Sequence, residues 1–319
     1  MGVHYDPNRP YVISGDSYGL LLRWIPTRGL TIPTFSFFSD LAEARRRAIE
    51  ELFGFCCIHL DERELSGAVR EKLAESNLPV IALDQNYTDG AGLPLELTRL
   101  CNPETLESTD CLGSRSGVPI AAQLDCIGAR IGPAEVQIAD DVIFSGKDLA
   151  RRLIGELKQR GIAVSRIVAG VVIEEGRARI QAAWPDIEIV PIRCYREVHD
   201  EVCERDFIAG VPLSGRLLGR DGVPVDPRTS APYFHPFARS ERDGKCFMKE
   251  WASLDSETVP DAVREWSRFC LTQSITLWRE IERLSGRLVH CSELERVPRG
   301  ISCDESHFTD HLDRILAEM

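Results

Sequence analysis

Two adjacent aspartates, Asp140 and Asp141, end an apolar run in the segment VQIADDVIFSGKDL and precede a Ser-Gly turn. The next apolar residues, Leu149, Leu153 and Leu157, recur at helical spacing. Ligands of parallel α/β sheets bind beyond the carboxyl ends of the strands, and the free N–H groups of a helix N-terminus attract anions. Paired carboxylates beside such a turn therefore suit a phosphorylated sugar, whose hydroxyls they would hold directly or through Mg²⁺.

Strands and helices must alternate along the chain to place these acids at a sheet edge. Hydrophobic periodicity predicts strands at 11–14, 20–25, 55–60, 78–84, 135–144, 165–173 and 187–195. It predicts helices at 39–53, 62–77, 118–131, 147–160, 176–185 and 259–286. Residues 55–84 are interpreted as a β-α-β unit, and the alternation indicates an α/β fold with a mostly parallel sheet. Residues 210–250 are rich in Gly and Pro and are expected to form loops.

The segment 136–149 resembles the phosphoribosyl pyrophosphate (PRPP) motif of type I phosphoribosyltransferases. That motif is an apolar strand, two acids, two apolar residues and a Ser/Thr-Gly phosphate loop. The matching residues are Val136, Ile138, Asp140, Asp141, Val142, Ile143, Ser145, Gly146 and Leu149. The segment departs from the family at Asp148, where the family has Thr or Ser.

Two flanking segments are also similar to the family. Residues 113–132 resemble its pyrophosphate loop and the helix that follows, and 206–224 resembles the tail over the base in the hypoxanthine and xanthine enzymes. Two departures concern function. Only about two dozen residues separate Gly117 from Asp140, where the family fits a longer segment with a lid, and Glu174 and Glu175 stand where purine-specific members place a Lys.

The resemblance implies an enzyme of nucleotide metabolism that transfers ribose 5-phosphate from PRPP to a nitrogenous base and releases pyrophosphate. It implies catalytic roles for Asp140, Asp141 and Arg115, with Mg²⁺ held by the two aspartates. It implies that the substrate-binding residues are Ser114, Ser116, Gly117, Phe144, Ser145, Gly146, Lys147, Asp148 and Phe207. Two alternatives stay open: a non-catalytic protein that senses PRPP or a nucleotide, and an enzyme acting on a ribosyl group without a 5′-phosphate.

The expected fold is a mostly parallel sheet of phosphoribosyltransferase type with additional N-terminal α/β elements and a C-terminal helical region. The expected domains are an N-terminal α/β extension at 1–78, the phosphoribosyltransferase-like core at 79–220, and a loop-rich and helical region at 221–319. The acceptor base is not specified by the sequence, and a homodimer is among the assemblies left open.

Composition and charge limit the partners and the compartment. The 319 residues carry a net charge of −12, so bulk charge does not favour nucleic acid or an anionic membrane. The eleven cysteines form no C-x-x-C pair, and no signal pattern opens the chain, so we expect reduced thiols and a cytoplasmic protein. The C-terminal Cys291, Cys303, His307 and His311 lack a zinc-knuckle spacing and are expected to be metal-free.

Overall fold

The computed structural model describes residues 9–102, 108–215, 217–220, 223–224, 238–239, 246–247, 260–298 and 301–319. Contacts divide the chain into two compact units. Unit 1 comprises Met1–His59, Arg99–Cys111 and Val202–Met319, and unit 2 comprises Leu60–Thr98 and Leu112–Glu201. The chain thus passes between the units four times, whereas the three-part division expected from the sequence is linear and stays a prediction.

Unit 2 is built on a five-stranded sheet with the strand order β4-β3-β7-β8-β9, and every neighbouring pair is parallel. The strands are β3 (Val80–Ala82), β4 (Leu93–Pro94), β7 (Ala134–Ile143), β8 (Ile162–Ile173) and β9 (Glu188–Tyr195). β8 is buried almost throughout its length, which is typical of a parallel strand covered on both faces. The predicted α/β class with a mostly parallel sheet is confirmed.

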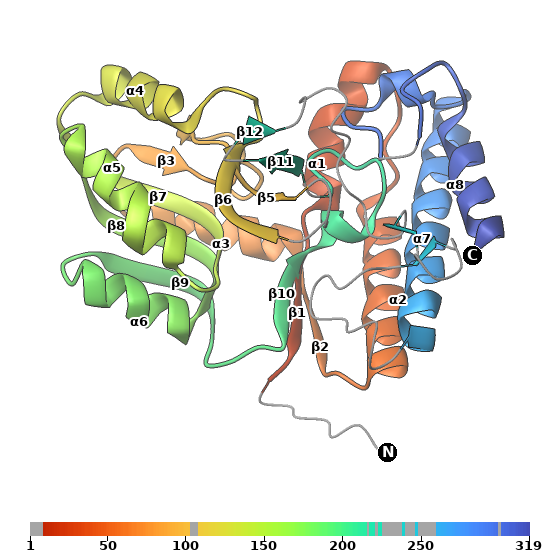
Figure 1. Ribbon diagram of the computed structural model, residues 1–319, viewed down its shortest axis with the longest axis horizontal. Helices are drawn as coiled ribbons and strands as arrows, with labels where there is room; N and C mark the ends of the chain where they lie inside the picture. Colours follow the sequence, from red (N-terminus) through yellow and green to blue (C-terminus); the bar gives the residue numbers. More distant parts are fainter. Residues whose placement is uncertain are drawn as a thin grey trace. The chain divides into compact units, whose positions relative to one another are not determined.

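Helices cover both faces of this sheet (Figure 1). They are α3 (Glu62–Ala74), α4 (Ile120–Ile131), the π-helical turn η2 (Leu149–Leu153) with α5 (Ile154–Gln159), and α6 (Glu174–Ala183). Side chains of α4, η2, α5 and α6 join one hydrophobic cluster with β7 and β8. α3 packs on the other face, and its N-terminus is capped by Asp61, whose carboxylate accepts from the Glu64 N–H at 3.0 Å.

In the part of unit 1 that the structure describes, short strands are combined with four α-helices. The remaining described strands lie in unit 1 or, as β2, β5, β6 and β10 do, cross its border along the chain. They are β1 (Tyr11–Ser14), β2 (Cys57–Leu60), β5 (Leu97–Cys101), β6 (Ser108–Ser114), β10 (Asp200–Cys203), β11 (Leu217–Arg220), β12 (Val223–Pro224), β13 (Ala238–Arg239) and β14 (Cys246–Phe247). The helices of unit 1 are α1 (Ser17–Trp24), α2 (Phe35–Phe53), α7 (Pro260–Ser285) and α8 (Phe308–Glu318), with short 3-10 turns at Ile25–Arg28, Glu204–Phe207 and Cys291–Glu293. α7 packs against both α2 and α8 (Figure 1).

The core of unit 1 contains two buried ion pairs beside its apolar clusters. Arg45 of α2 donates to Glu204 at 2.5 Å, and both side chains are almost fully buried. Arg205 likewise pairs with Asp16, which also accepts from the Arg205 backbone N–H at 2.9 Å. Burial raises the pKa of Glu204, but Arg45 and His59 outweigh this effect and hold it well below its usual range.

Three expectations from the sequence need correction or restriction. The strand predicted at 20–25 is wrong, because Leu20, Leu21 and Trp24 have the i, i+1, i+4 spacing of one helical face and are buried on α1. The β-α-β unit at 55–84 is also wrong: β2 belongs to the sheet β10-β1-β2, whereas β3 belongs to the parallel sheet of unit 2. Residues 210–250 lie mostly outside the described residues.

The other predicted elements are confirmed to within a few residues at their ends. A helical stretch begins after the Ser-Gly turn as predicted, but its first part is π-helical, a conformation that often marks functional sites. In the described ranges, no helix combines the length and the apolar character that a membrane crossing requires.

Candidate functional site

Three carboxylates gather at the carboxyl ends of two neighbouring parallel strands of unit 2. β3 pairs with β7 in the register Ala82↔Ala139, and the Leu83 N–H donates to the Ala139 carbonyl at 2.8 Å. Asp84 therefore follows β3 beside Asp140 and Asp141, which lie in the last four residues of β7. Asp84 is the last residue of the strand predicted at 78–84, but it is not among the site residues that the sequence predicts. The carboxyl ends of adjacent parallel strands meet at one edge of the sheet, and this rule could have linked Asp84 to Asp140 and Asp141.

Asp84 is held in a tight turn. The residue is only 7% exposed, and its carboxylate accepts from the backbone N–H groups of Asn86 at 2.7 Å and Tyr87 at 3.1 Å. These bonds fix the side chain next to the strand end. Asp84 thus contributes a fixed negative charge to this edge of the sheet.

Asp140 and Asp141 are half-buried, and each carboxylate accepts from the next backbone N–H, at 3.0 Å from Asp141 and 2.8 Å from Val142. The pKa of Asp140 lies well above its usual range. Burial is the largest cause, followed by the negative charge of Asp141 and then that of Asp84. The cluster is therefore electrostatically crowded, and a bound cation or a proton would relieve it.

The neighbouring strand makes room for this backbone. Gly170 of β8 lies opposite the acidic pair, and a Cβ atom at Gly170 would lie 2.8 Å from the Asp141 carbonyl oxygen. Such a distance is too short for a side chain, so only glycine permits the approach seen here. The strand end that carries Asp141 is thus set by tight packing as well as by the ladder of hydrogen bonds.

The loop after the acids, 144–148, is fixed against α6. Gly146 has φ = 63°, and a Cβ atom there would lie 2.6 Å from the Gly176 carbonyl oxygen. A Cβ atom at Gly176 would in turn lie 2.4 Å from the Phe144 carbonyl oxygen. The guanidinium of Arg179 donates to the Ser145 carbonyl. Two glycines and one arginine therefore hold the loop in place.

The helical stretch begins directly within this loop. The Ala150 N–H donates to the Gly146 carbonyl at 2.9 Å, and Asp148 has helical dihedral angles. Lys147 is exposed and Asp148 is half-buried. The N-terminal groups of this stretch can receive an anion, while Asp148 brings a negative charge into the same turn.

The second predicted loop, 114–117, is held from within unit 2. Ser114 is buried, and its hydroxyl lies 2.9 Å from the Ser116 hydroxyl and accepts from Gln123 at 2.8 Å. The Arg115 Nε donates to the Leu97 carbonyl at 2.9 Å. The half-buried Arg115 and the exposed residues Ser116 and Gly117 therefore remain candidates for binding, whereas the Ser114 hydroxyl has a structural role.

Phe207 does not fit its expected place over a base. It lies in unit 1, is 1% exposed, and packs edge-on against Trp266 with ring centroids 5.3 Å apart. A ring in this core has no free face for stacking, so the proposed site omits Phe207. Its apolar neighbours in the sequence reflect core packing and not a base-binding tail.

A cavity of about 330 Å³ lies elsewhere in unit 2. It is lined by Glu75, Ser76, Leu78, Ser165, Arg166 and Glu188. Ser165 and Arg166 belong to the first part of β8 and Glu188 begins β9, so the cavity lies at the amino ends of the strands. Arg166 forms ion pairs with Glu75 at 3.0 Å and Glu188 at 3.1 Å, so its charge stabilises the fold and is not directed to a ligand.

Fold and site together define an α/β protein with a parallel sheet, an acidic cluster at its carboxyl edge and a fixed loop beside it. No family model and no curated protein matches the chain. Among solved structures, it is similar to adenine phosphoribosyltransferase from Thermoanaerobacter pseudethanolicus, with 12% identity and a TM-score of 0.25 over 41% of this chain and 80% of that one. This likeness is too weak to support a function, which must be argued from the site.

Proposed function

We propose that unit 2 binds the Mg²⁺ complex of PRPP and transfers ribose 5-phosphate to a nitrogenous base. The observation that carries the proposal is the crowding of Asp84, Asp140 and Asp141 at one sheet edge, directly before a fixed loop that opens a helical stretch. Burial and the neighbouring charges raise the pKa of Asp140, which is unfavourable for folding, and such an arrangement is expected at binding sites. The motif resemblance at 136–149 supports the choice of ligand.

The donor set fits a hard divalent cation. Carboxylate oxygens are the protein ligands that Mg²⁺ prefers, and the negative charges around Asp140 favour a cation electrostatically. Asp140 and Asp141 would hold the ion, with Asp84 as the adjacent charge. Bound Mg²⁺ would supply charge neutralisation for the departing pyrophosphate.

The chain's own residues would orient the substrate. Asp140 and Asp141 would accept hydrogen bonds from the ribose hydroxyls, and the backbone N–H groups of 145–148 would frame the 5′-phosphate. Arg115 and the exposed loop beside it would face the pyrophosphate. In the reaction, the bond from ribose C1 to the pyrophosphate oxygen breaks and a bond from C1 to the base nitrogen forms, with loss of the proton carried by that nitrogen. Positioning and electrostatic stabilisation would provide most of the rate.

Asp148 favours a second candidate, an enzyme that acts on a ribosyl group without a 5′-phosphate. An ionised carboxylate about 4 Å from a phosphate would repel it by about 4 kcal/mol per unit charge pair at an effective dielectric near 20. The half-buried position of Asp148 in the first turn of the helical stretch puts this charge next to the proposed phosphate loop.

The test is calorimetric titration with Mg²⁺-PRPP, followed by assay of pyrophosphate release with a panel of bases. Asp141→Asn should weaken binding about 10- to 100-fold, because hydrogen bonds to a charged group contribute about 1.5–3 kcal/mol. Glu135→Gln, an exposed acid at the amino end of the same strand, is the matched control and should bind as wild type does.

The outcomes separate the candidate functions. Binding with turnover supports the transferase, and binding without turnover of any base supports a sensing protein. Preference for an unphosphorylated nucleoside supports the second candidate. Equal affinity in Asp141→Asn and wild type removes the acidic pair from the site.

A further inference from the structure

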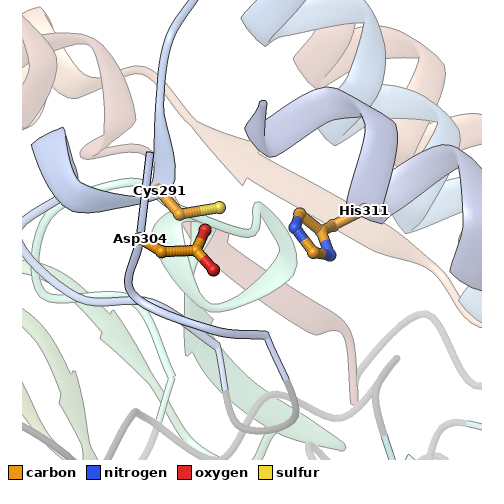
Figure 2. A group of neighbouring side chains, drawn as sticks. All are labelled: Cys291, Asp304 and His311. Atoms are coloured by element: carbon orange, nitrogen blue, oxygen red, sulfur yellow. The ribbon is translucent and has the colours of Figure 1, made fainter. Parts of the chain in front are cut away.

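We propose a transition-metal site, independent of the function proposed for unit 2, formed in unit 1 by Cys291, Asp304 and His311. The candidate ligand atoms of the three residues all lie within 4.8 Å of one another. Figure 2 shows the Cys291 sulfur, the Asp304 carboxylate and the His311 ring directed into one small region from three segments of chain. Zn²⁺ is the cation that this mixture of thiolate, carboxylate and imidazole fits best.

Backbone pairing brings two of these segments together. The Cys291 N–H donates to the Ser306 carbonyl at 2.9 Å, and the Ser292 N–H donates to the Asp304 carbonyl at 2.8 Å. An antiparallel bridge joins His290 to His307. The chain at 289–292 therefore runs beside 304–308, and this pairing places Cys291 and Asp304 at neighbouring positions.

The third ligand comes from a helix anchored in the core. Phe308 and Leu312 of α8 are fully buried and belong to the same hydrophobic cluster as Cys291. His311 lies between them in sequence, one turn into the helix, and is half-buried. Because the core fixes both the cysteine and the helix, the ligands are held in position before any ion binds, which lowers the cost of binding.

A single hydroxyl connects all three candidate ligands. The Ser306 Oγ lies 2.7 Å from the His311 Nε2, 3.7 Å from the Cys291 Sγ, and within hydrogen-bond distance of Asp304 Oδ1. A hydroxyl has one proton and can donate to only one of these atoms. Lone pairs of three candidate ligand atoms therefore converge around the Ser306 hydroxyl. A cation can interact with all three atoms, whereas the single hydroxyl proton can satisfy one of them.

The charges balance for a divalent ion. A Cys291 thiolate and an Asp304 carboxylate together carry two negative charges, and a neutral His311 adds none. Asp304 is exposed, so an ion can enter from solvent. The Sγ of Cys303 lies 4.0 Å from the Cys291 carbonyl oxygen, which puts a second thiol beside the site.

This set differs from the four residues considered in the sequence, which are Cys291, Cys303, His307 and His311. The His307 Nε2 lies 2.7 Å from Glu282 and its Nδ1 lies 3.1 Å from Asp310. His307 is therefore committed to two carboxylates, and Asp304 takes the place of the second histidine. The expectation that the C-terminal residues are metal-free is replaced by this proposal.

The test begins with elemental analysis of the full chain purified without chelators, which should give one zinc per chain. His311→Ala and Asp304→Asn should lower the Zn²⁺ affinity by at least about 10-fold. His307→Ala and Cys126→Ser, which remove a histidine and an exposed thiol outside the set, should retain the metal. Circular dichroism of each variant verifies that loss of metal does not follow from unfolding.

Cobalt substitution gives a readout specific for the proposed ligands. Co²⁺-loaded wild type should show a thiolate-to-cobalt charge-transfer band and the visible bands of a four-coordinate site, and Cys291→Ser should lose the charge-transfer band. Ser306→Ala should retain it, because the hydroxyl connects the ligands but is not one of the three. The proposal is overturned if metal is substoichiometric in wild type, if Cys291→Ser keeps the band, or if His307→Ala loses metal while His311→Ala does not.

Discussion

Replacing Asp140 with asparagine is expected to stabilise the protein at neutral pH while it removes Mg²⁺ binding. Burial removes the Asp140 carboxylate from solvent, and Asp141 and Asp84 bring negative charges close to it. Both effects raise the pKa of Asp140. An acid whose pKa is higher in the folded than in the unfolded state opposes folding once the pH exceeds its unfolded value. Asparagine keeps the shape of the side chain and removes the charge.

The magnitude follows from the charges. Two unit charges about 4 Å apart interact by about 4 kcal/mol at an effective dielectric near 20, which is an upper bound here. Proton uptake and solvent relieve much of this at a half-buried site, so we expect Asp140→Asn to gain about 1–2 kcal/mol near pH 7. That corresponds to a rise of about 2–8 °C in the unfolding midpoint.

The pH dependence provides the sharper assay. Below the unfolded pKa of about 4, Asp140 is protonated in both states and the variant should have no advantage. The advantage should appear as the pH rises through that value and become constant above the folded pKa. Thermal unfolding from pH 4 to 8, with and without Mg²⁺, measures it, and Glu135→Gln on the same strand is the control. A variant that is no more stable than wild type at pH 7, or equally stabilised by Mg²⁺, would refute the reasoning.

Three further predictions concern the loop at 144–148, the glycine of α6 that packs against this loop, and a buried ion pair of unit 1. Asp148→Thr should tighten binding of a 5′-phosphorylated ligand at equal salt and Mg²⁺, because it removes a negative charge from the loop; weaker or unchanged affinity means that the carboxylate points away from the phosphate. Gly176→Ala should lower the free energy of unfolding in chemical denaturation by about 1–3 kcal/mol, because the new Cβ would lie 2.4 Å from a carbonyl oxygen. The control is Gly155→Ala, which lies in a helix with open space around it and should raise the free energy of unfolding by about 0.5–1 kcal/mol. Glu204→Gln should cost about 3–5 kcal/mol at pH 7, because it leaves the buried Arg45 without a negatively charged partner. Since the pKa of Glu204 is depressed, the cost of Glu204→Gln should shrink as the pH falls below about 4; a constant cost across this range speaks against the ion pair.

Local sequence was sufficient for the elements that surround the acidic pair. The apolar runs at 135–144 and 165–173 predicted β7 and β8, because a strand buried on both faces must be apolar along its length. Asp140 and Asp141 interrupt such a run close to its carboxyl end, two residues before β7 stops at Ile143. The Ser-Gly turn predicted a helical start, because Gly146 supplies the positive φ that the turn requires.

Residues brought together from distant segments could be found only in the tertiary structure. Asp84 joins Asp140 because β3 and β7 are neighbours in the sheet, and β2 leaves the expected β-α-β unit because it pairs with β1. Strand pairing of this kind depends on which partner edge is free, and local periodicity contains no information about it.

The same limit applies to the side chains of unit 1. Phe207 has the type and position of a base-stacking residue in sequence, but packing against Trp266 buries it. Cys291 and His311 are twenty residues apart and no motif joins them to Asp304, yet the bridge at 290 and 307 and the buried face of α8 bring all three within reach of one ion. The sequence by itself determined the acidic pair and most of the secondary structure, though not the helix α1, because these depend on nearest neighbours, whereas tertiary packing alone decided which distant groups share a site.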